Sequence, residues 1–284
     1  RWLGIRERYT HIIAPEIIAG REGHLQQEEW FAHLYGPTNA PMASARELVA
    51  EMDRCGVDRS VVCGFAWNSF DLYVETNSYI ADAVSRFPDR LIGFANVPPL
   101  HPGAAAELER CLQLGFAGIG ELKPDGQGFE LSDREGMAAL TTLARENGLP
   151  LLIHLSEPVG RLYPGKGHTS PRKGFEFAAG NPELKLVYAH WGGGLPFYEL
   201  MPDVRQALTN VCYDCSASPY LYRSDVYRVA LGSVGRDKIL FGSDYPLISP
   251  ERYLRELDGL NLGEEDRAAI LGGNAMSLLG LETS

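Results

Sequence analysis

The chain has 284 residues, of which 45% are hydrophobic and 22% are charged, and its formal net charge is -11. This length fits one large domain over residues 1–284, because a single α/β barrel commonly takes roughly 250 residues. The acidic charge argues against nucleic acid and anionic membranes as partners, since both are polyanions. We therefore expect a small-molecule substrate, and a homo-oligomer stays open.

The cysteines and apolar runs bear on the compartment. The five cysteines are odd in number and widely scattered, which is typical of a reducing compartment rather than of a disulfide framework. Cys212 and Cys215 lie three positions apart in a strand pattern, so their side chains point to opposite faces and no redox or metal pair is expected. No apolar run of about 18 residues and no leader pattern is present, and we expect a cytoplasmic location.

The first part of the chain is irregular. Residues 1–13, RWLGIRERYTHII, predict a strand that ends at His11 but is interrupted by three charged residues, Arg6 to Arg8. Residues 12–43 are too long for an ordinary connection and predict a lid or loop over a site. This segment contains Trp30, Phe31 and Tyr35.

From Ser44 onward helices and strands alternate. Ser44 and Glu47 form a capping-box pattern at the start of a helix that stops at Gly56, and the strand DRSVVCGF follows. Further helices are expected at 71–87, 102–114, 133–147, 171–179, 196–208 and 223–234. The strands between them are LIGFANV, AGIGEL, LPLLIHLSE, LKLVYAHWGGG, NVCYDCSA and KILFGSDYP. Strands that alternate with helices of this length pair in parallel, and eight of them predict a (β/α)8 TIM barrel. A doubly wound open sheet is the alternative, but no Gly-rich phosphate turn follows an early strand.

Several expected strands end in a polar side chain that can ligate a metal. These side chains are His11, Glu121, His154, His190 and Asp244. Because catalytic groups of such barrels come from the carboxyl ends of the strands, we expect the five to share one site. A buried histidine that only satisfies the core is the alternative for any one of them.

Imidazoles and carboxylates that converge are suitable ligands for Zn²⁺. His11, His154 and Asp244 are the expected metal ligands, and Glu121 is a fourth candidate, unless it forms an ion pair with Lys123 or another neighbour. His190 has no evident structural role, and an imidazole beside a metal can act as a general base or polarise a carbonyl. Zn²⁺ is the expected metal, and Mn²⁺ is the alternative.

Two further segments were considered for binding. The loop 157–170 carries Arg161, Lys166 and His168 in an otherwise acidic chain, so Arg161 and His168 are candidates to bind a substrate carboxylate; a solvated loop is the alternative. Gly192 to Gly194 lack the pattern of a phosphate-binding loop, so we expect them to relieve the backbone below His190.

The segments AGIGEL, LLIHLSEPVG, YAHWGGGLPFYELMP and ILFGSDYPLISP resemble the amidohydrolase-related metal-dependent hydrolases, in the branch that includes aminocarboxymuconate semialdehyde decarboxylase. The resemblance extends from about Thr10 to Leu281 and implies a distorted TIM barrel. It implies that His154 and Asp244 are metal ligands and that His190 helps to activate metal-bound water. The family opens with His-x-His, whereas this chain has Tyr9-Thr10-His11. Neutral tyrosine, with a pKa of about 10, is a poor ligand at pH 7. The metal is then held by fewer ligands, with help from Glu121, or the working first strand is a different one.

These inferences favour a metal-dependent hydrolase of a small, carboxylate-bearing substrate, with metal-bound hydroxide as nucleophile, Asp244 shuttling the proton and His190 assisting. The alternative is non-oxidative decarboxylation of a small unsaturated or aromatic acid, in which the same residues protonate the carbon that loses CO₂. From a different class, a barrel without metal would serve as a binding protein. The metal content of the purified chain distinguishes an enzyme from such a binding protein.

Overall fold

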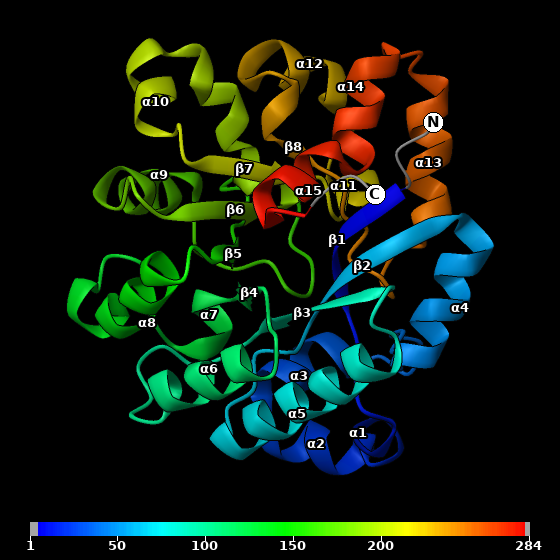
Figure 1. Cartoon of the computed structure of the whole chain (residues 1–284), viewed down its shortest axis with the longest axis vertical. Coiled ribbons are helices and arrows are strands. Elements are labelled where there is room, and N and C mark those ends of the chain that lie inside the picture. The colour runs from blue at the N-terminus through cyan, green and yellow to red at the C-terminus, as the bar shows by residue number, and fades with distance from the viewer. Residues whose placement is uncertain (1–4, 282–284) are drawn as a thin grey trace.

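The strands form one closed barrel. The computed structural model describes residues 5–281, with side chains from Thr10 onward. Eight parallel strands follow one another in chain order around the sheet. Thr10 also pairs in parallel with Tyr245, just after the last strand, and the backbone N–H of His11 donates to the carbonyl of Tyr245 at 2.8 Å. The chain is therefore a distorted (β/α)8 TIM barrel, as the alternating pattern predicts (Figure 1). The strands are β1 Ile5–His11, β2 Val57–Cys63, β3 Leu91–Ala95, β4 Gly118–Leu122, β5 Pro150–His154, β6 Lys185–Ala189, β7 Val211–Asp214 and β8 Ile239–Leu240.

Helices surround the strands on the outside (Figure 1). The longer ones follow the strands as crossovers, and shorter ones lie in the loops. They are α1 Pro15–Ala19, α2 Arg21–Gln27, α3 Glu29–Tyr35, α4 Ala45–Cys55, α5 Phe70–Arg86, α6 Ala104–Gln113, α7 Pro124–Gln127, α8 Arg134–Glu146, α9 Pro171–Gly180, α10 Pro202–Ala207, α11 Ser218–Leu221, α12 Val226–Val234, α13 Pro250–Gly259, α14 Glu264–Ala268 and α15 Asn274–Leu279. None of these helices, within residues 5–281, is long and apolar enough to cross a bilayer.

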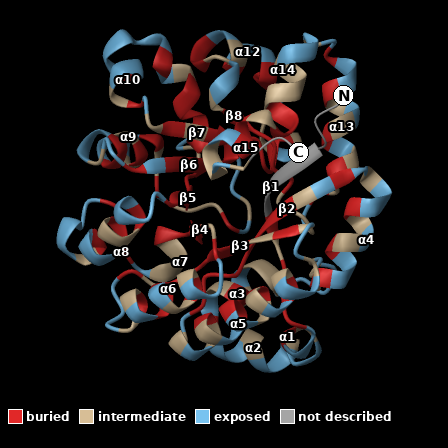
Figure 2. Cartoon of the chain, in the orientation of Figure 1, coloured by how far each residue is buried: buried red, intermediate tan, exposed pale blue. Residues whose placement is uncertain are grey.

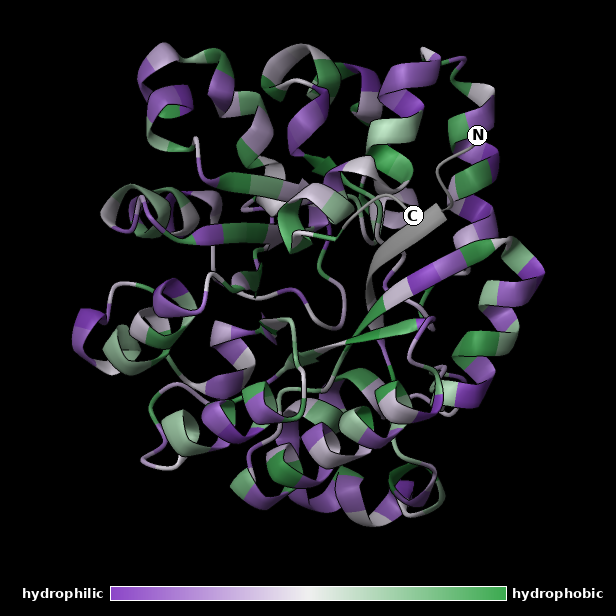
Figure 3. Ribbon diagram, in the orientation of Figure 1, coloured by the Kyte–Doolittle hydropathy of each residue, from purple (hydrophilic) through white to green (hydrophobic). Residues whose placement is uncertain are grey.

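The core has two layers that follow from the alternation of side chains along each strand. In β5, Leu151 and Ile153 pack outward among the residues of the surrounding helices. Leu152 points the other way, into a cluster with Val187 of β6 and Leu240 of β8 inside the barrel. Figure 2 shows the buried strands at the centre with exposed residues on the outer helix faces, and Figure 3 shows the same division in hydropathy.

The helix that follows the first loop begins and ends as its sequence predicts. The backbone N–H of Ser44 donates to the Glu47 carboxylate at 2.7 Å, and the Ser44 hydroxyl accepts from the Glu47 N–H, which completes the capping box of α4. Gly56 ends the helix with a φ of 70°, in the left-handed region where glycine is favoured. The boundaries of α5, α6, α8 and α9 also lie within two residues of the expected ones.

The expected irregular stretch at 12–43 is wrong in detail, because α1, α2 and α3 form there. These helices are too short to show a clear 3.6-residue stripe, and aromatic packing against later segments stabilises them instead. The ring of Phe31 stacks on Trp67 at a centroid distance of 5.2 Å and meets Phe65 edge-on at 5.7 Å. The end of α3 lines the central cavity, so the segment does cover a site.

The single helix expected at 196–208 is also wrong. The segment His190–Leu200 is a series of tight turns, and α10 begins only at Pro202. Trp191 and the glycines at 192–194 have positive φ angles, which an α-helix cannot include. The helix expected at 223–234 starts at Val226, and α11 precedes it. None of the five cysteines, all of which lie within the described residues, forms a disulfide.

Candidate metal and active site

Gly120 allows β4 to approach β5 closely enough for the polar residues at their ends, Glu121 and His154, to meet. Its φ is +126°, and a Cβ at this position would lie 2.3 Å from the carbonyl oxygen of Leu152. Only glycine fits such an approach without moving the backbone. As a result the next side chain, Glu121, lies beside His154, with 2.9 Å between an Oε atom and Nδ1.

The backbone turns at the ends of β6 and β8 place His190 and Asp244. Both residues have positive φ angles, 57° and 59°, which are uncommon for residues other than glycine and which concentrate at functional sites. Gly193 follows His190 and lies so close to β5 that a Cβ would be 2.6 Å from the carbonyl oxygen of Ser156. The expectation that this glycine run relieves the backbone is therefore confirmed.

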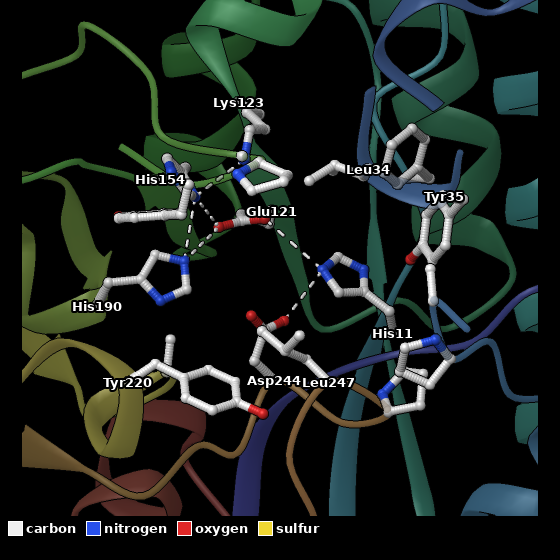
Figure 4. Close-up of a pocket in the computed structure, with 18 of the residues that line it drawn as sticks. His11, Leu34, Tyr35, Glu121, Lys123, His154, His190, Tyr220, Asp244 and Leu247 are labelled. Atoms are coloured by element: carbon white, nitrogen blue, oxygen red, sulfur yellow. Dashed lines mark hydrogen bonds and ion pairs between the residues drawn. The ribbon is translucent and has the colours of Figure 1, made fainter. Parts of the chain in front are cut away.

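The five polar strand ends converge, as expected (Figure 4). Glu121 is at the centre of the group, and its carboxylate lies 2.9 Å from His154, 3.6 Å from His190 and 3.7 Å from His11. The Nε2 atom of His190 lies 3.1 Å from Nδ1 of His154. His11 also approaches Asp244, with 3.6 Å between Nε2 and an Oδ atom.

Each of the three histidines has a ring nitrogen within hydrogen-bond distance of a polar group outside the cluster, which orients the ring. Nδ1 of His11 lies 2.9 Å from the carbonyl oxygen of Gly64. The Ser216 hydroxyl lies 3.0 Å from Nδ1 of His190. Nε2 of His154 lies 3.2 Å from the Ser156 hydroxyl. Such partners fix ring orientation, and they are the usual surroundings of imidazoles that ligate a metal.

Burial and the neighbouring charges shift the pKa of every group in the cluster. Burial, with Lys123 nearby, lowers the pKa of His154 to about 4, so its imidazole is neutral at pH 7. Burial lowers the pKa values of His11 and His190 too, but the carboxylates of Glu121 and Asp244 outweigh it and raise both overall. Burial opposes ionisation of Glu121, yet the surrounding imidazoles hold its pKa well below the usual range. Burial raises the pKa of Asp244.

This donor set fits a divalent cation. Glu121, His154 and His190 each offer a ligand atom, and these atoms lie within 4.8 Å of one another. Carboxylate oxygen and neutral imidazole nitrogen are ligands for Zn²⁺ and Mn²⁺ alike. Among residues with described side chains, the Glu121 carboxylate contacts the imidazoles of three histidines and forms no ion pair with Lys123, so that alternative is wrong. The side chain of Tyr9 lies outside the described part, and its role stays a prediction.

The cluster opens into a cavity of about 470 Å³. This volume is within the usual range for a small-molecule site. Aromatic side chains form part of the wall, and Figure 4 shows Tyr35 and Tyr220 on either side of the polar cluster. The lining includes Tyr35, Phe65, Tyr163 and Tyr220, besides the five polar tips. The cavity therefore has room for a small molecule, with polar groups and apolar ring surface in its wall.

The two expected substrate contacts lie in different places. Arg161 lines the cavity from its exposed loop and donates a hydrogen bond to the carbonyl of Tyr220 at 3.3 Å. His168 is exposed and is not among the described residues that line the cavity; its backbone N–H donates to Asp125. Lys123, which is buried in the cavity wall, was considered in the sequence only as a partner for Glu121. The sequence signal that could have identified Lys123 as a cavity residue is its position two residues after Glu121, near the end of a strand, and directly before Pro124.

Eight parallel strands with carboxylates and imidazoles at their carboxyl ends define a barrel enzyme with a divalent-metal site. Residues 19–281 match the amidohydrolase family, and the chain belongs to it. A γ-resorcylate decarboxylase of Polaromonas sp. is 27% identical over 249 residues, covering 72% of this chain and 75% of the relative. A 2-amino-3-carboxymuconate-6-semialdehyde decarboxylase of Dictyostelium discoideum is 24% identical over 254 residues, covering 76% and 68%.

The fold is shared with solved decarboxylase structures. The 5-carboxyvanillate decarboxylase of Sphingomonas paucimobilis superposes with a TM-score of 0.78 at 18% identity, covering 99% of this chain and 100% of that one. The enzyme of the same name from Novosphingobium aromaticivorans, solved with manganese and a nitrobenzoic acid, gives 0.79 at 19% identity, covering 98% and 96%. The two curated relatives favour the decarboxylase alternative over the hydrolase that the sequence placed first.

Proposed function

We propose that this chain is a metal-dependent, non-oxidative decarboxylase of a small aromatic acid. The observation that carries the proposal is the group of a buried carboxylate, three imidazoles and Asp244 in a cavity whose wall includes aromatic side chains. The names of the curated relatives, which are decarboxylases, support the reaction class.

The candidate ligands of the cation are Glu121, His154 and His190, with His11 and Asp244 at the edge of the same group. A bound divalent cation would supply the positive charge that holds the oxygen atoms of an acidic substrate. Manganese in a solved neighbour makes Mn²⁺ as good a candidate as the Zn²⁺ expected from the ligand types. His190 is held by Ser216, so its ring is positioned whether it ligates or assists.

Asp244 is the proposed proton donor. Burial raises its pKa, which favours the protonated form that a donor needs. Its Oδ–H would transfer a proton to the ring carbon that bears the carboxylate. The bond between that carbon and the carboxylate then breaks, its electron pair restores the aromatic ring, and CO₂ leaves. Solvent water returns a proton to Asp244.

The remaining lining residues would hold the ring and its acid group. The rings of Tyr35 and Phe65 offer flat apolar surface to an aromatic substrate. Arg161 lies at the exposed side of the cavity, where its guanidinium can attract a carboxylate. Contact of His168 with the substrate stays a prediction.

The test is a panel of acids incubated with the chain after loading with Mn²⁺ or Zn²⁺. The panel contains 2,6-dihydroxybenzoate, 5-carboxyvanillate and other hydroxybenzoates, and both CO₂ and the phenolic product are measured. Release of equal amounts of the two from at least one acid is the expected result. If no acid loses CO₂ while lactones or amides of the same acids are hydrolysed, the hydrolase replaces the decarboxylase.

A further inference from the structure

Asp214, the last residue of β7, is a buried carboxylate close to the metal cluster that the proposed reaction does not use. Its side chain is buried, and it is not among the described residues that line the cavity. Its Oδ1 atom accepts a hydrogen bond from the backbone N–H of Ser216 at 2.6 Å. Its Oδ2 atom has no hydrogen-bond partner among the described residues. A buried carboxylate with one unpaired oxygen is costly, so folding alone does not account for it.

The backbone at Gly242 leaves room for this carboxylate. A Cβ at position 242 would overlap Oδ2 of Asp214 and would lie 2.8 Å from its Cγ. Any other residue at position 242 would therefore displace the carboxylate. The ends of two neighbouring strands are thus matched to one buried charge, which β7 supplies and which the segment after β8 accommodates.

Ser216 connects Asp214 to His190. Nδ1 of His190 lies 3.2 Å from the carbonyl oxygen of Ser216 and 3.0 Å from its hydroxyl. A carbonyl oxygen can only accept a hydrogen bond, so Nδ1 of His190 carries a proton. The hydroxyl of Ser216 then accepts from Nδ1 as well, which leaves its own hydrogen for another acceptor.

The carboxylate of Asp214 is an acceptor within reach of that hydroxyl. Burial raises the pKa of Asp214 to about 6, and hydrogen bonding from the side chain and the backbone N–H of Ser216 opposes this rise. Asp214 is therefore ionised at pH 7. The three groups form a chain in which the imidazole donates to the hydroxyl and the hydroxyl donates to the carboxylate.

The other ring nitrogen of His190 faces the candidate metal ligands. Its Nε2 atom lies 3.1 Å from Nδ1 of His154 and 3.6 Å from the carboxylate of Glu121, and Figure 4 shows the ring turned toward both. With the proton on Nδ1, the lone pair of Nε2 is directed at this group. A hydrogen-bond acceptor on the far nitrogen fixes the tautomer of an imidazole that ligates a metal and makes it a stronger base.

A purely local role is the alternative for Asp214. An aspartate side chain that accepts from the N–H two residues later forms a common turn, and asparagine forms the same turn equally well. The two explanations therefore differ in what they predict for an asparagine at this position.

We infer that Asp214 is a positioning residue of the metal site, which acts through the hydroxyl of Ser216 to keep the proton of His190 on Nδ1 and its Nε2 atom free for the cation. The inference rests on the proposed function for the place of His190 among the metal ligands. Neither Asp214 nor Ser216 is in the described cavity lining, so direct contact with the substrate is not part of this role.

The experiment measures metal affinity by competition with a chromophoric chelator, for Zn²⁺ and for Mn²⁺. The variants are Asp214→Asn, which keeps the shape and the turn but removes the charge, Ser216→Ala, which removes the connecting hydroxyl, and the double variant. Glu199→Gln is the matched control, because Glu199 is also a buried carboxylate and accepts from Tyr213 of β7 at 2.7 Å, but is not in the described cavity lining. Circular dichroism shows whether each variant is folded, and Ser216→Ala serves if Asp214→Asn is not.

Each single variant should bind metal about tenfold or more weakly than the wild-type chain, because losing the partner of a metal-ligating histidine typically costs 10- to 100-fold in affinity. The double variant should bind within about twofold of Ser216→Ala alone, since Asp214 has no connection to His190 once the hydroxyl is gone. Glu199→Gln should bind as the wild-type chain does.

A second readout follows the tautomer itself. The chain is labelled with ¹⁵N in its histidines and loaded with Zn²⁺, and the ring nitrogens are observed by NMR, with the signals of His190 identified by their absence in His190→Asn. We expect a proton on Nδ1 of His190 and none on Nε2. The shift of Nδ1 should change in Asp214→Asn and should stay the same in Glu199→Gln.

Wild-type metal affinity in Asp214→Asn would overturn the inference and leave Asp214 with the turn alone. Losses that multiply in the double variant, or a proton on Nε2 of His190 in the wild-type chain, would overturn it as well. The proposed function fails separately. If no acid of the panel loses CO₂ but the two single losses are coupled, the positioning role stands and the decarboxylase does not.

Discussion

Glu121 and His154 come from adjacent strands, and an Oε atom of the first lies 2.9 Å from Nδ1 of the second. The carboxylate is buried, and His154 has a pKa of about 4, so the pair unites a negative charge with a neutral imidazole at pH 7. Metal ligands must be deprotonated, and this pair already is. We therefore place this pair at the centre of the metal site, with the other three polar strand ends around it.

Removing a ligand should remove the metal and leave the barrel intact. Replacing His154 or Glu121 with Ala should weaken metal binding by at least about 100-fold, because a structural zinc site draws on the order of 10 to 16 kcal/mol from about four ligands. Elemental analysis after dialysis measures the loss, and circular dichroism measures the fold. His168→Ala is the matched control, since His168 is exposed and outside the described cavity lining. Full metal content in both variants would remove these residues from the ligand set.

Completing the family's first motif should strengthen the site. Tyr9→His restores the His-x-His pattern, and residues at spacing i, i+2 share a face in a regular strand, so the variant should bind Mn²⁺ or Zn²⁺ about tenfold more tightly or better. Competition with a chromophoric chelator gives the affinity. If affinity and activity match those of the wild-type chain, position 9 is not a ligand position.

The role of Asp244 as proton donor can be tested with a substitution that keeps the shape of its side chain. Asp244→Asn keeps the size of the side chain but cannot supply an acidic proton, and kcat should fall by about 10² to 10⁴. Steady-state kinetics on the acid that the panel identifies gives kcat, and metal content is measured on the same sample so that loss of metal is not mistaken for loss of the proton donor. Asp71→Asn, on the exposed start of α5, should behave as wild type. A kcat within twofold of wild type for Asp244→Asn would exclude the proposed role.

The acid stability of the chain should depend on Glu51. Its carboxylate contacts Arg54 at 2.7 Å and accepts from Ser249 at 2.5 Å, which joins α4 to the start of α13. The hydrogen bond from Arg54 lowers the pKa of Glu51 from 4.5 to about 2, so the stabilisation is present above about pH 4.5 and is lost as the pH falls toward 2.

Urea unfolding of the wild-type chain and of Glu51→Gln between pH 7 and pH 3 measures this effect. The difference in unfolding free energy should be largest at neutral pH and should shrink below about pH 4.5. A difference that does not depend on pH would mean that the carboxylate charge is not the cause. Glu29→Gln, on an exposed side chain of α3, is a suitable control.

Most of the polar strand ends were predictable because they close an apolar run, and His11 is the exception, since Arg6, Glu7 and Arg8 interrupt its strand. Parallel strands of one barrel bring such ends together, so His11, Glu121, His154, His190 and Asp244 could be grouped without coordinates. The assignment of His190 was less secure, because spacing along the chain does not show that its Nε2 lies 3.1 Å from His154. That distance depends on the left-handed turn at the end of β6.

The rest of the cavity depends on contacts between distant segments. The helices of residues 12–43 form because Phe31 packs on Trp67, and nothing in the short pattern around Phe31 identifies that partner. Tyr35 reaches the cavity for the same reason. Lys123 was a plausible ion-pair partner for Glu121 in the sequence, and only the positions of the three histidines show that Glu121 is already engaged.

The most direct test of the account follows the atoms of the reaction. An acid that the panel identifies is prepared with ¹³C in its carboxyl group and incubated with the metal-loaded chain in D₂O, and the products are examined by NMR. We expect the label to leave as CO₂ or bicarbonate and one deuterium to appear at the ring carbon that carried it. A label that stays in the organic product, beside a newly hydrolysed bond, would contradict the decarboxylase.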